Sequence, residues 1–95
     1  MRIKIPIISD HGNDPEDITP ILEQAARQCS RVSPEHKVQA IVKGLGADGI
    51  NYELRVWSDV GENSPAAVRS QVYRAVAKAF VEHNLEINPD PDIAI

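Results

Sequence analysis

The chain has 95 residues, of which 42% are hydrophobic and 25% are charged, and its formal net charge is −4. This composition is that of a single globular domain and excludes intrinsic disorder. The acidic balance argues against nucleic acid as a partner, because phosphate binding depends on Lys and Arg. The longest run without Asp, Glu, Lys or Arg is residues 63–68, whereas a membrane-spanning helix needs about 20 mostly apolar residues.

The first predicted element is a strand over residues 2–9. From residue 2 to residue 7, isoleucine alternates with Arg, Lys or Pro, which is the period of two that a half-buried strand shows. Pro6 cannot donate a hydrogen bond to a neighbouring strand. We therefore expect this strand at a sheet edge, or paired on one side only at that point.

A helix is predicted after the turn-forming residues 10–13. Asp14 can cap it, Pro15 suits its first position, and the acidic residues that follow are favourable at the positive end of a helix dipole. Apolar residues then recur at spacings of three and four, and we expect the helix to run to about Val32. Pro20 predicts either a kink or a later start of the regular helix. The apolar face consists of Ile18, Ile21, Leu22, Ala25, Ala26 and Cys29.

Two further strands, residues 37–43 and 50–58, flank a glycine-rich segment that predicts a hairpin turn. A second helix is predicted to begin at Ser64 and Pro65, which repeat the cap-then-proline signal, and to continue to about Phe80. A short strand is predicted at residues 85–87. Within residues 50–58, those expected to face inward are Ile50, Tyr52, Leu54 and Val56, and those expected to face outward are Asn51, Glu53, Arg55 and Trp57.

The order βαββαβ predicts an α+β, ferredoxin-like sandwich, with a four-stranded antiparallel sheet and two helices on one face. Residues 1–88 are expected to form this domain, and residues 89–95 a proline-rich tail. The sheet face without helices would expose apolar side chains, which is typical of an interface. The alternative is that the stems of Lys and Arg side chains cover them. The residues expected at a subunit interface are Ile8, Ile41 and Trp57 on the uncovered face, with Ile93 and Ile95 in the tail.

No catalytic, cofactor or metal site is predicted. Residues 44–49 match the pattern G-x-G-x-x-G, but a dinucleotide site needs a helix directly afterwards, and a strand is predicted there. The three histidines lack the spacing of metal ligands, and His11 is interpreted as part of a solvated turn. Asp90 and Asp92 lie in a tail expected in solvent, which does not favour a catalytic carboxyl pair. Cys29 falls in an apolar stripe and is expected to be a buried structural thiol. We therefore expect no enzyme.

Three other functions use the same order of elements. An RNA-binding domain of the RRM type would carry several aromatic residues on its open sheet face, whereas Trp57 is the one expected there. An acylphosphatase-like enzyme would need an arginine after the first strand to hold phosphate, and residues 10–14 contain none. A regulatory, small-ligand-binding domain of the ACT type binds through loop glycines and backbone atoms. It remains the alternative.

Several short segments occur in a characteristic order along the chain. They are Asn13-Asp14-Pro15-Glu16, Leu54-Arg55-Val56-Trp57, Val68-Arg69-Ser70, Ala79-Phe80 and residues 87–91. In order and spacing they resemble the C-terminal cytosolic domain of the MscS family of small-conductance mechanosensitive ion channels. The family pattern is a strand similar to LELRVW, an amphipathic helix ending in AF, and a strand similar to GIEIPFPQ. Asp90 departs from it, because an aromatic residue usually stands between the two tail prolines.

The resemblance implies the vestibule domain of an MscS-like channel, with no catalytic centre. In this family, seven subunits form an ion-permeable cage beneath the pore, and their final strands gather into a small axial barrel. The tail would then lead into a truncated barrel strand. The resemblance further implies a soluble segment on the cytoplasmic side of the inner membrane, with other copies of itself as partners and membrane contact only through missing transmembrane segments. Seven copies at −4 each would repel one another, so the isolated chain is expected to form no stable heptamer.

Overall fold

The computed structural model describes residues 1–59, 61 and 63–83. Within them the chain runs through β1 (Arg2–Ser9), α1 (Pro15–Arg27), β2 (Gln39–Leu45), β3 (Ile50–Trp57) and α2 (Pro65–Glu82). The type and order of these elements confirm the prediction. The strand predicted at residues 85–87 and the tail 89–95, with Ile93 and Ile95, lie outside the described residues.

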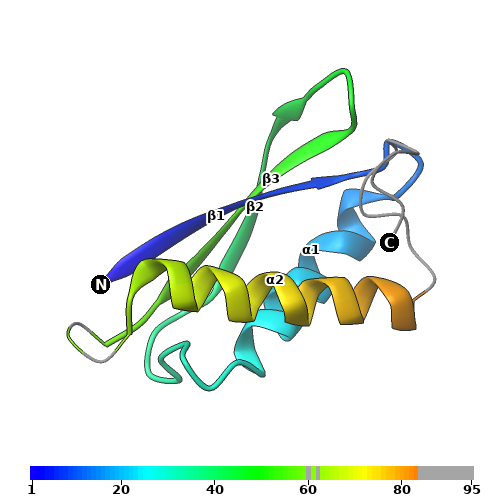
Figure 1. Cartoon of the computed structure of the whole chain (residues 1–95). Helices are drawn as coiled ribbons and strands as arrows, with labels where there is room; N and C mark the ends of the chain where they lie inside the picture. The colour runs from blue at the N-terminus through cyan, green and yellow to red at the C-terminus, as the bar shows by residue number, and fades with distance from the viewer. Residues whose placement is uncertain (60, 62, 84–95) are drawn as a thin grey trace.

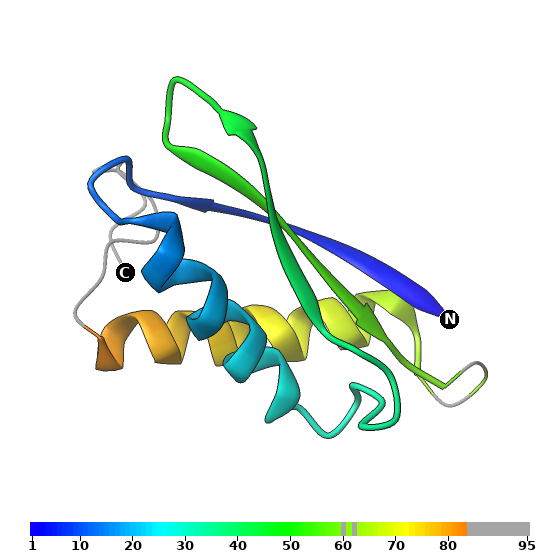
Figure 2. The same ribbon diagram turned by 180° about the vertical axis from the view of Figure 1, so that it is seen from behind.

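The strand β3 lies at the centre of the sheet, between β1 and β2, and is antiparallel to both. The register places Ile5 and Ala40 on either side of Leu54. Figures 1 and 2 show both helices on the same face of the sheet, so the opposite face has no helix over it. The structure therefore confirms an α+β fold in which two helices cover one face of an antiparallel sheet.

The apolar core lies between the sheet and the two helices. The residues of β3 predicted to face inward are each 5% exposed or less. Ile18 and Leu22 of α1, together with Val68, Val72 and Phe80 of α2, belong to the same cluster and are 0% exposed. Burying each such side chain contributes about 1.5–3 kcal/mol. Buried side chains thus recur every two residues in the strands and every three to four residues in the helices, and both sets pack in the same core layer.

Both helices begin with the predicted cap-then-proline signal. The Asp14 carboxylate accepts a hydrogen bond of 2.9 Å from the backbone N–H two residues further on. The Ser64 hydroxyl oxygen accepts one of 3.1 Å from the backbone N–H three residues further on. Pro15 and Pro65 follow these caps in the first turn, where a missing N–H costs no hydrogen bond. Because α1 continues through Pro20, it starts at its cap and not at this second proline.

The first helix ends at Arg27, so the predicted end near Val32 was wrong. Beyond it the chain continues in tight turns, in which the Cys29 N–H donates to the Ala26 carbonyl and the Val32 N–H to the Cys29 carbonyl, each at 3.1 Å. Cys29 and Val32 are each 5% exposed and still belong to the core. These turns keep the spacing of three residues between buried side chains, which is why the apolar pattern extended beyond the helix.

The strand β2 begins and ends two residues later than predicted. A bulge between Val42 and Gly44 interrupts its pairing with β3. The glycine-rich hairpin turn is confirmed, and the Gly46 N–H donates to the Gly49 carbonyl at 2.8 Å. Gly49 has a φ of +155° and lies against the Ser9 carbonyl, so a Cβ atom at this position would overlap the backbone of β1.

Candidate assembly surface

The uncovered side of the sheet, which we call the open face, is the main candidate surface. It carries alternate residues of each strand, because successive side chains of a strand point to opposite faces. The helix-side residues of β3 are buried, and its open-face residues are half-buried, which confirms the predicted directions. The open face comprises Arg2, Lys4, Pro6 and Ile8 of β1, Gln39 and Ile41 of β2, and Asn51, Glu53, Arg55 and Trp57 of β3.

Charge on the open face is mostly positive. Arg2, Lys4 and Arg55 lie on it, Lys43 stands at the adjoining bulge of β2, and Glu53 is the one carboxylate among them. The Arg55 Nε atom lies 2.6 Å from Glu53 Oε2, which is the one ion pair within residues 1–59, 61 and 63–83. Since the whole chain has a formal net charge of −4, the open face differs in sign from the molecule.

The positive charges around Glu53 affect the pKa of its carboxyl group. Its pKa lies below the ordinary value of 4.5, and the hydrogen bond from Arg55 is the largest cause. Partial loss of water acts in the opposite direction, and the positive charges of Lys43, Arg55 and Lys4 lower the pKa further. Cations from three different strands therefore act on one carboxylate.

Trp57 lies at one end of the open face, and its ring is partly covered from within the chain. The His36 ring, in the loop before β2, stacks on it with centroids 4.7 Å apart and ring planes inclined by 17°. The His36 Nδ1 atom also lies 3.1 Å from the Ser33 hydroxyl oxygen. The sequence did not reveal this contact, because neither residue stands in a motif that joins the loop to β3.

The other apolar residues predicted for the open face are Ile8, which is 39% exposed, and Ile41, which is half-buried. The register places Ile8 and Trp57 near opposite ends of β3, with Ile41 between them. The three side chains are thus spread among charged neighbours and do not form one apolar patch. Their role in a subunit contact stays a prediction, as does that of Ile93 and Ile95.

Side chains from the helices contact individual backbone groups on both outer edges of the described sheet. From α2, the Arg69 Nε donates to the Lys4 carbonyl of β1 at 3.4 Å. Beside it, the Tyr73 hydroxyl donates to the Pro6 carbonyl at 2.8 Å. On the other edge, Glu23 of α1 accepts a hydrogen bond of 2.9 Å from a backbone N–H of β2. Because unpaired edge groups invite another strand, these contacts protect part of each edge.

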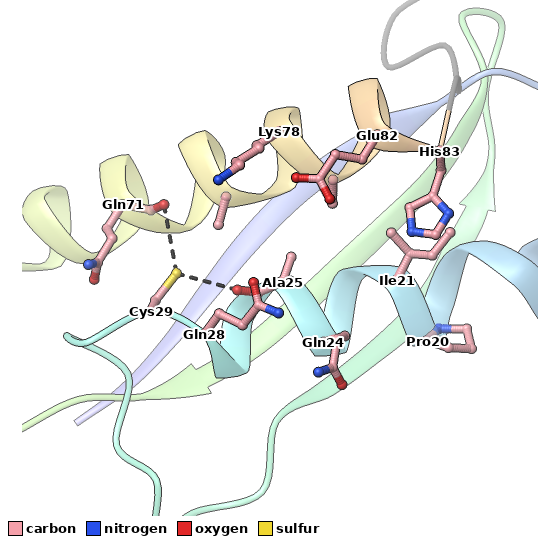
Figure 3. A pocket seen from close by; sticks show the side chains of 12 residues that line it. Pro20, Ile21, Gln24, Ala25, Gln28, Cys29, Gln71, Lys78, Glu82 and His83 are labelled. Carbon is pink, nitrogen blue, oxygen red and sulfur yellow. Dashed lines mark hydrogen bonds between the residues drawn. The ribbon is translucent and has the colours of Figure 1, made fainter.

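A groove of about 550 Å³ lies on the helical side of the molecule, between α1 and α2. Figure 3 shows the Cys29 sulfur pointing across it toward α2, where the Gln71 carbonyl is 3.8 Å away. Cys29 is buried, as predicted, and its burial raises the pKa of the thiol. Alanines line the groove together with Lys78 and Glu82, so its walls are both apolar and charged.

The turn between β1 and α1 is joined to the β2–β3 hairpin. The His11 Nε2 atom lies 2.8 Å from the Gly46 carbonyl oxygen, which ties this turn to the hairpin. The Tyr52 hydroxyl nearby is buried without a hydrogen-bond partner among the described residues. Its pKa is raised by burial and, secondarily, by the charge of Asp14. In the part of the chain that the structure describes, no three His, Cys, Asp or Glu side chains are grouped to hold a metal ion.

The class of protein that this geometry defines is an α+β domain with helices on one sheet face and an open, basic face on the other. No helix among the described residues has both the length and the apolarity to cross a membrane. The family model "Mechanosensitive ion channel MscS, C-terminal" matches residues 3–87. The chain therefore belongs to the MscS C-terminal domain family, as the resemblance indicated, and this is a family of channel domains and not of enzymes.

A solved structure with the same fold is the crystal structure of Helicobacter pylori MscS in its closed state. It matches with a TM-score of 0.82 and 22% sequence identity. The match covers 100% of this chain and 38% of that one, so the present chain spans well under half the length of that protein. At this identity the likeness shows the fold. The comparison with curated proteins found no match.

Proposed function

We propose that this chain is the cytosolic vestibule domain of an MscS-like mechanosensitive channel, where it joins neighbouring subunits and forms part of the ion-permeable cage below the pore. The match of residues 3–87 to the MscS C-terminal family carries this proposal. The likeness to the H. pylori channel, with a TM-score of 0.82 over the whole chain, supports it. The family match also favours this function over an ACT-like ligand-binding domain.

In this proposal, seven copies of the parent protein form a ring on the cytoplasmic side of the inner membrane. The strand order β1-β3-β2 corresponds to three strands of a ferredoxin-like sheet, with β1 free for a fourth. The expected fourth strand, residues 85–87, lies outside the described residues. Residues 89–95 would lead toward the axial barrel.

The test uses the full-length product of the reading frame that contains this chain, expressed in bacterial cells that lack mechanosensitive channels of their own. We expect tension-activated currents in membrane patches and improved survival of sudden dilution. The purified protein is expected to sediment as an oligomer. A product that gives no tension-activated current and remains a monomer would refute the proposal.

Trp57→Asp in the same full-length product tests the open face as the subunit contact. A buried interfacial tryptophan is often an energetic anchor, and a loss of about 2 kcal/mol corresponds to roughly thirtyfold weaker association. Arg74→Asp, at an exposed position of α2 outside the open face, is the matched control. Unchanged assembly of the Trp57→Asp protein would show that Trp57 is not part of the interface. It would not contradict the proposed channel function.

A further inference from the structure

One end of the molecule carries mostly negative charge. No Lys or Arg occurs from residue 5 to residue 26. The hydrogen bond of 2.8 Å between His11 and the Gly46 carbonyl brings the tip of the β2–β3 hairpin to the same end. None of these carboxylates makes an ion pair within the described part of the chain. We define this acidic end as Asp10, Asp14, Glu16, Asp17 and Asp48.

The hydrogen bonds at the acidic end leave its negative charge available. Asp10 and Asp14 accept hydrogen bonds from backbone N–H groups, at 2.7 and 2.9 Å, which satisfy one oxygen of each without neutralising it. Glu16, Asp17 and Asp48 are exposed. A carboxylate that is exposed and not paired with a cation can take part in a contact with a positive surface at little desolvation cost.

The open face has the complementary sign. Lys4, Lys43 and Arg55 come from three different strands and surround the single carboxylate of Glu53. Arg2 extends this basic surface toward the start of β1. The half-buried side chain of Trp57 adds an apolar ring of the kind that is enriched at interfaces. No helix covers this surface (Figure 2).

We propose that the open face of one copy of this chain binds the acidic end of a second copy. The inference rests on the proposed function, because it names the contact through which the subunits of the channel would assemble. The basic side chains of the open face would face the first turn of α1 and the hairpin tip of the neighbour. Complementary charge of this kind fixes which surfaces meet and accelerates their encounter.

The contact joins two different surfaces, and this has a consequence for the shape of the assembly. Arg2 and Lys4 lie near the start of β1, whereas Asp10 follows its end, and α1 begins on the helical side of the sheet (Figure 1). Each bound copy therefore keeps one free open face or one free acidic end. Head-to-tail contacts of this type generate a closed ring when the rotation between copies closes.

The net charge of each copy, taken alone, predicts that copies repel one another, which is the opposite of the proposed attraction. A formal −4 for each copy predicts repulsion that salt relieves. Charges separated onto two surfaces attract, however, when those surfaces face each other, and salt then weakens the contact. The groove between α1 and α2 is a poorer docking site, because its Lys78 and Glu82 walls have no dominant sign.

Charge reversal in the full-length product of the reading frame tests the contact. Lys4→Glu on the open face and Glu16→Lys on the acidic end each place like charges across it, and each is expected to weaken association about tenfold or more. The two substitutions together restore opposite charges in every contact, so most of the association measured by sedimentation is expected to return. A variant that merely unfolds would not be rescued by the second change.

Arg74→Glu is the matched control, with the same change of charge at an exposed position outside both surfaces. Combined with Glu16→Lys, it is expected to give no recovery. Association of the unaltered protein is expected to fall as salt rises from about 0.05 to about 0.5 M, where the screening length drops below about 5 Å. Association that grows over this range would contradict the proposed contact.

Crosslinking distinguishes the head-to-tail contact from a back-to-back one. In a Cys29→Ala background, copies that carry Lys4→Cys are mixed with copies that carry Glu16→Cys, and a bifunctional maleimide is expected to join unlike copies. Links between two Lys4→Cys copies would instead show that open faces meet each other, and would overturn the proposal.

The failures of the two proposals are distinguishable. A protein that gives tension-activated currents and self-associates, yet responds to neither the reversals nor their combination, would refute the contact and leave the vestibule function standing. A product that remains a monomer at every salt concentration and gives no current would refute both.

Discussion

The two faces of β3 differ in burial, charge and role. Leu54 on the helix side is 0% exposed and lies in the apolar core. Its neighbours Glu53 and Arg55 face the other way, are half-buried, and form an ion pair at 2.6 Å. A strand with a period of two can thus stabilise the fold with one set of residues and present a charged surface with the other. Substitutions on the two faces are expected to affect different properties of the protein.

The largest expected effect is on the covered face. Leu54→Ala is expected to lower the free energy of unfolding by about 2–5 kcal/mol, because it removes buried methyl groups and leaves a cavity. Gln39→Ala, on the exposed part of the open face, is expected to change it by less than about 0.5 kcal/mol. Urea unfolding of the two variants measures both values. Similar losses in both would show that the two faces do not divide their roles in this way.

An intermediate effect is expected at the boundary between the faces, where α2 closes the edge of β1. Tyr73→Phe keeps the ring and removes only the hydroxyl that donates to the Pro6 carbonyl at 2.8 Å. We expect a loss of about 0.5–1.5 kcal/mol in the free energy of unfolding, the usual net contribution of one hydrogen bond. An unchanged urea midpoint would mean that water replaces the hydroxyl without cost, and that edge closure adds no stability.

The smallest effect is expected on the open face, at Glu53. Its pKa is depressed below 4.5 in the folded state by Arg55 and the neighbouring cations. Because the folded state binds this proton less readily, Glu53 stabilises the fold above its unfolded pKa and loses this contribution as pH falls through the lower folded value. Glu53→Gln is therefore expected to be less stable than the unaltered chain near neutral pH. As the pH falls below about 4.5, the free energy of unfolding of the variant is expected to decrease less than that of the unaltered chain.

Thermal unfolding of the Glu53→Gln protein and of the unaltered chain across this pH range is the measurement. The difference between the two is expected to shrink on acidification, because a protonated Glu53 can no longer act as the negative partner of Arg55. A constant difference at every pH would show that the stabilisation does not depend on the charge of Glu53.

The elements themselves could be predicted because their signals are local. Alternating side chains specify β3, and the cap-then-proline pairs at Asp14 and Ser64 specify where both helices begin. The end of α1 could not be predicted, since Cys29 and Val32 keep helix-like spacing while the chain already turns. An apolar period reports which side chains are buried and not which backbone geometry buries them.

The candidate surface was predictable in part. The alternation placed Trp57 outside the core, but its stacking on His36 depends on how a distant loop folds back. The hydrogen bonds from Arg69 and Tyr73 to the edge of β1 could not be predicted either, because they join α2 to a strand more than 60 residues earlier. The absence of Lys and Arg from residues 5–26 was visible in the sequence. The fold was needed to show that a separate surface of the same chain, the open face, is basic.

The single thiol of the chain connects its two helices at one buried point. The Cys29 sulfur lies 3.5 Å from the Ala25 carbonyl oxygen of α1 and 3.8 Å from the Gln71 carbonyl oxygen of α2. Because burial raises its pKa, little of it is the reactive thiolate at neutral pH. Because the residue is only 5% exposed, a thiol reagent is expected to modify it faster when α1 and α2 separate. The rate of labelling therefore measures how often the helical layer opens, without any probe being added to the protein.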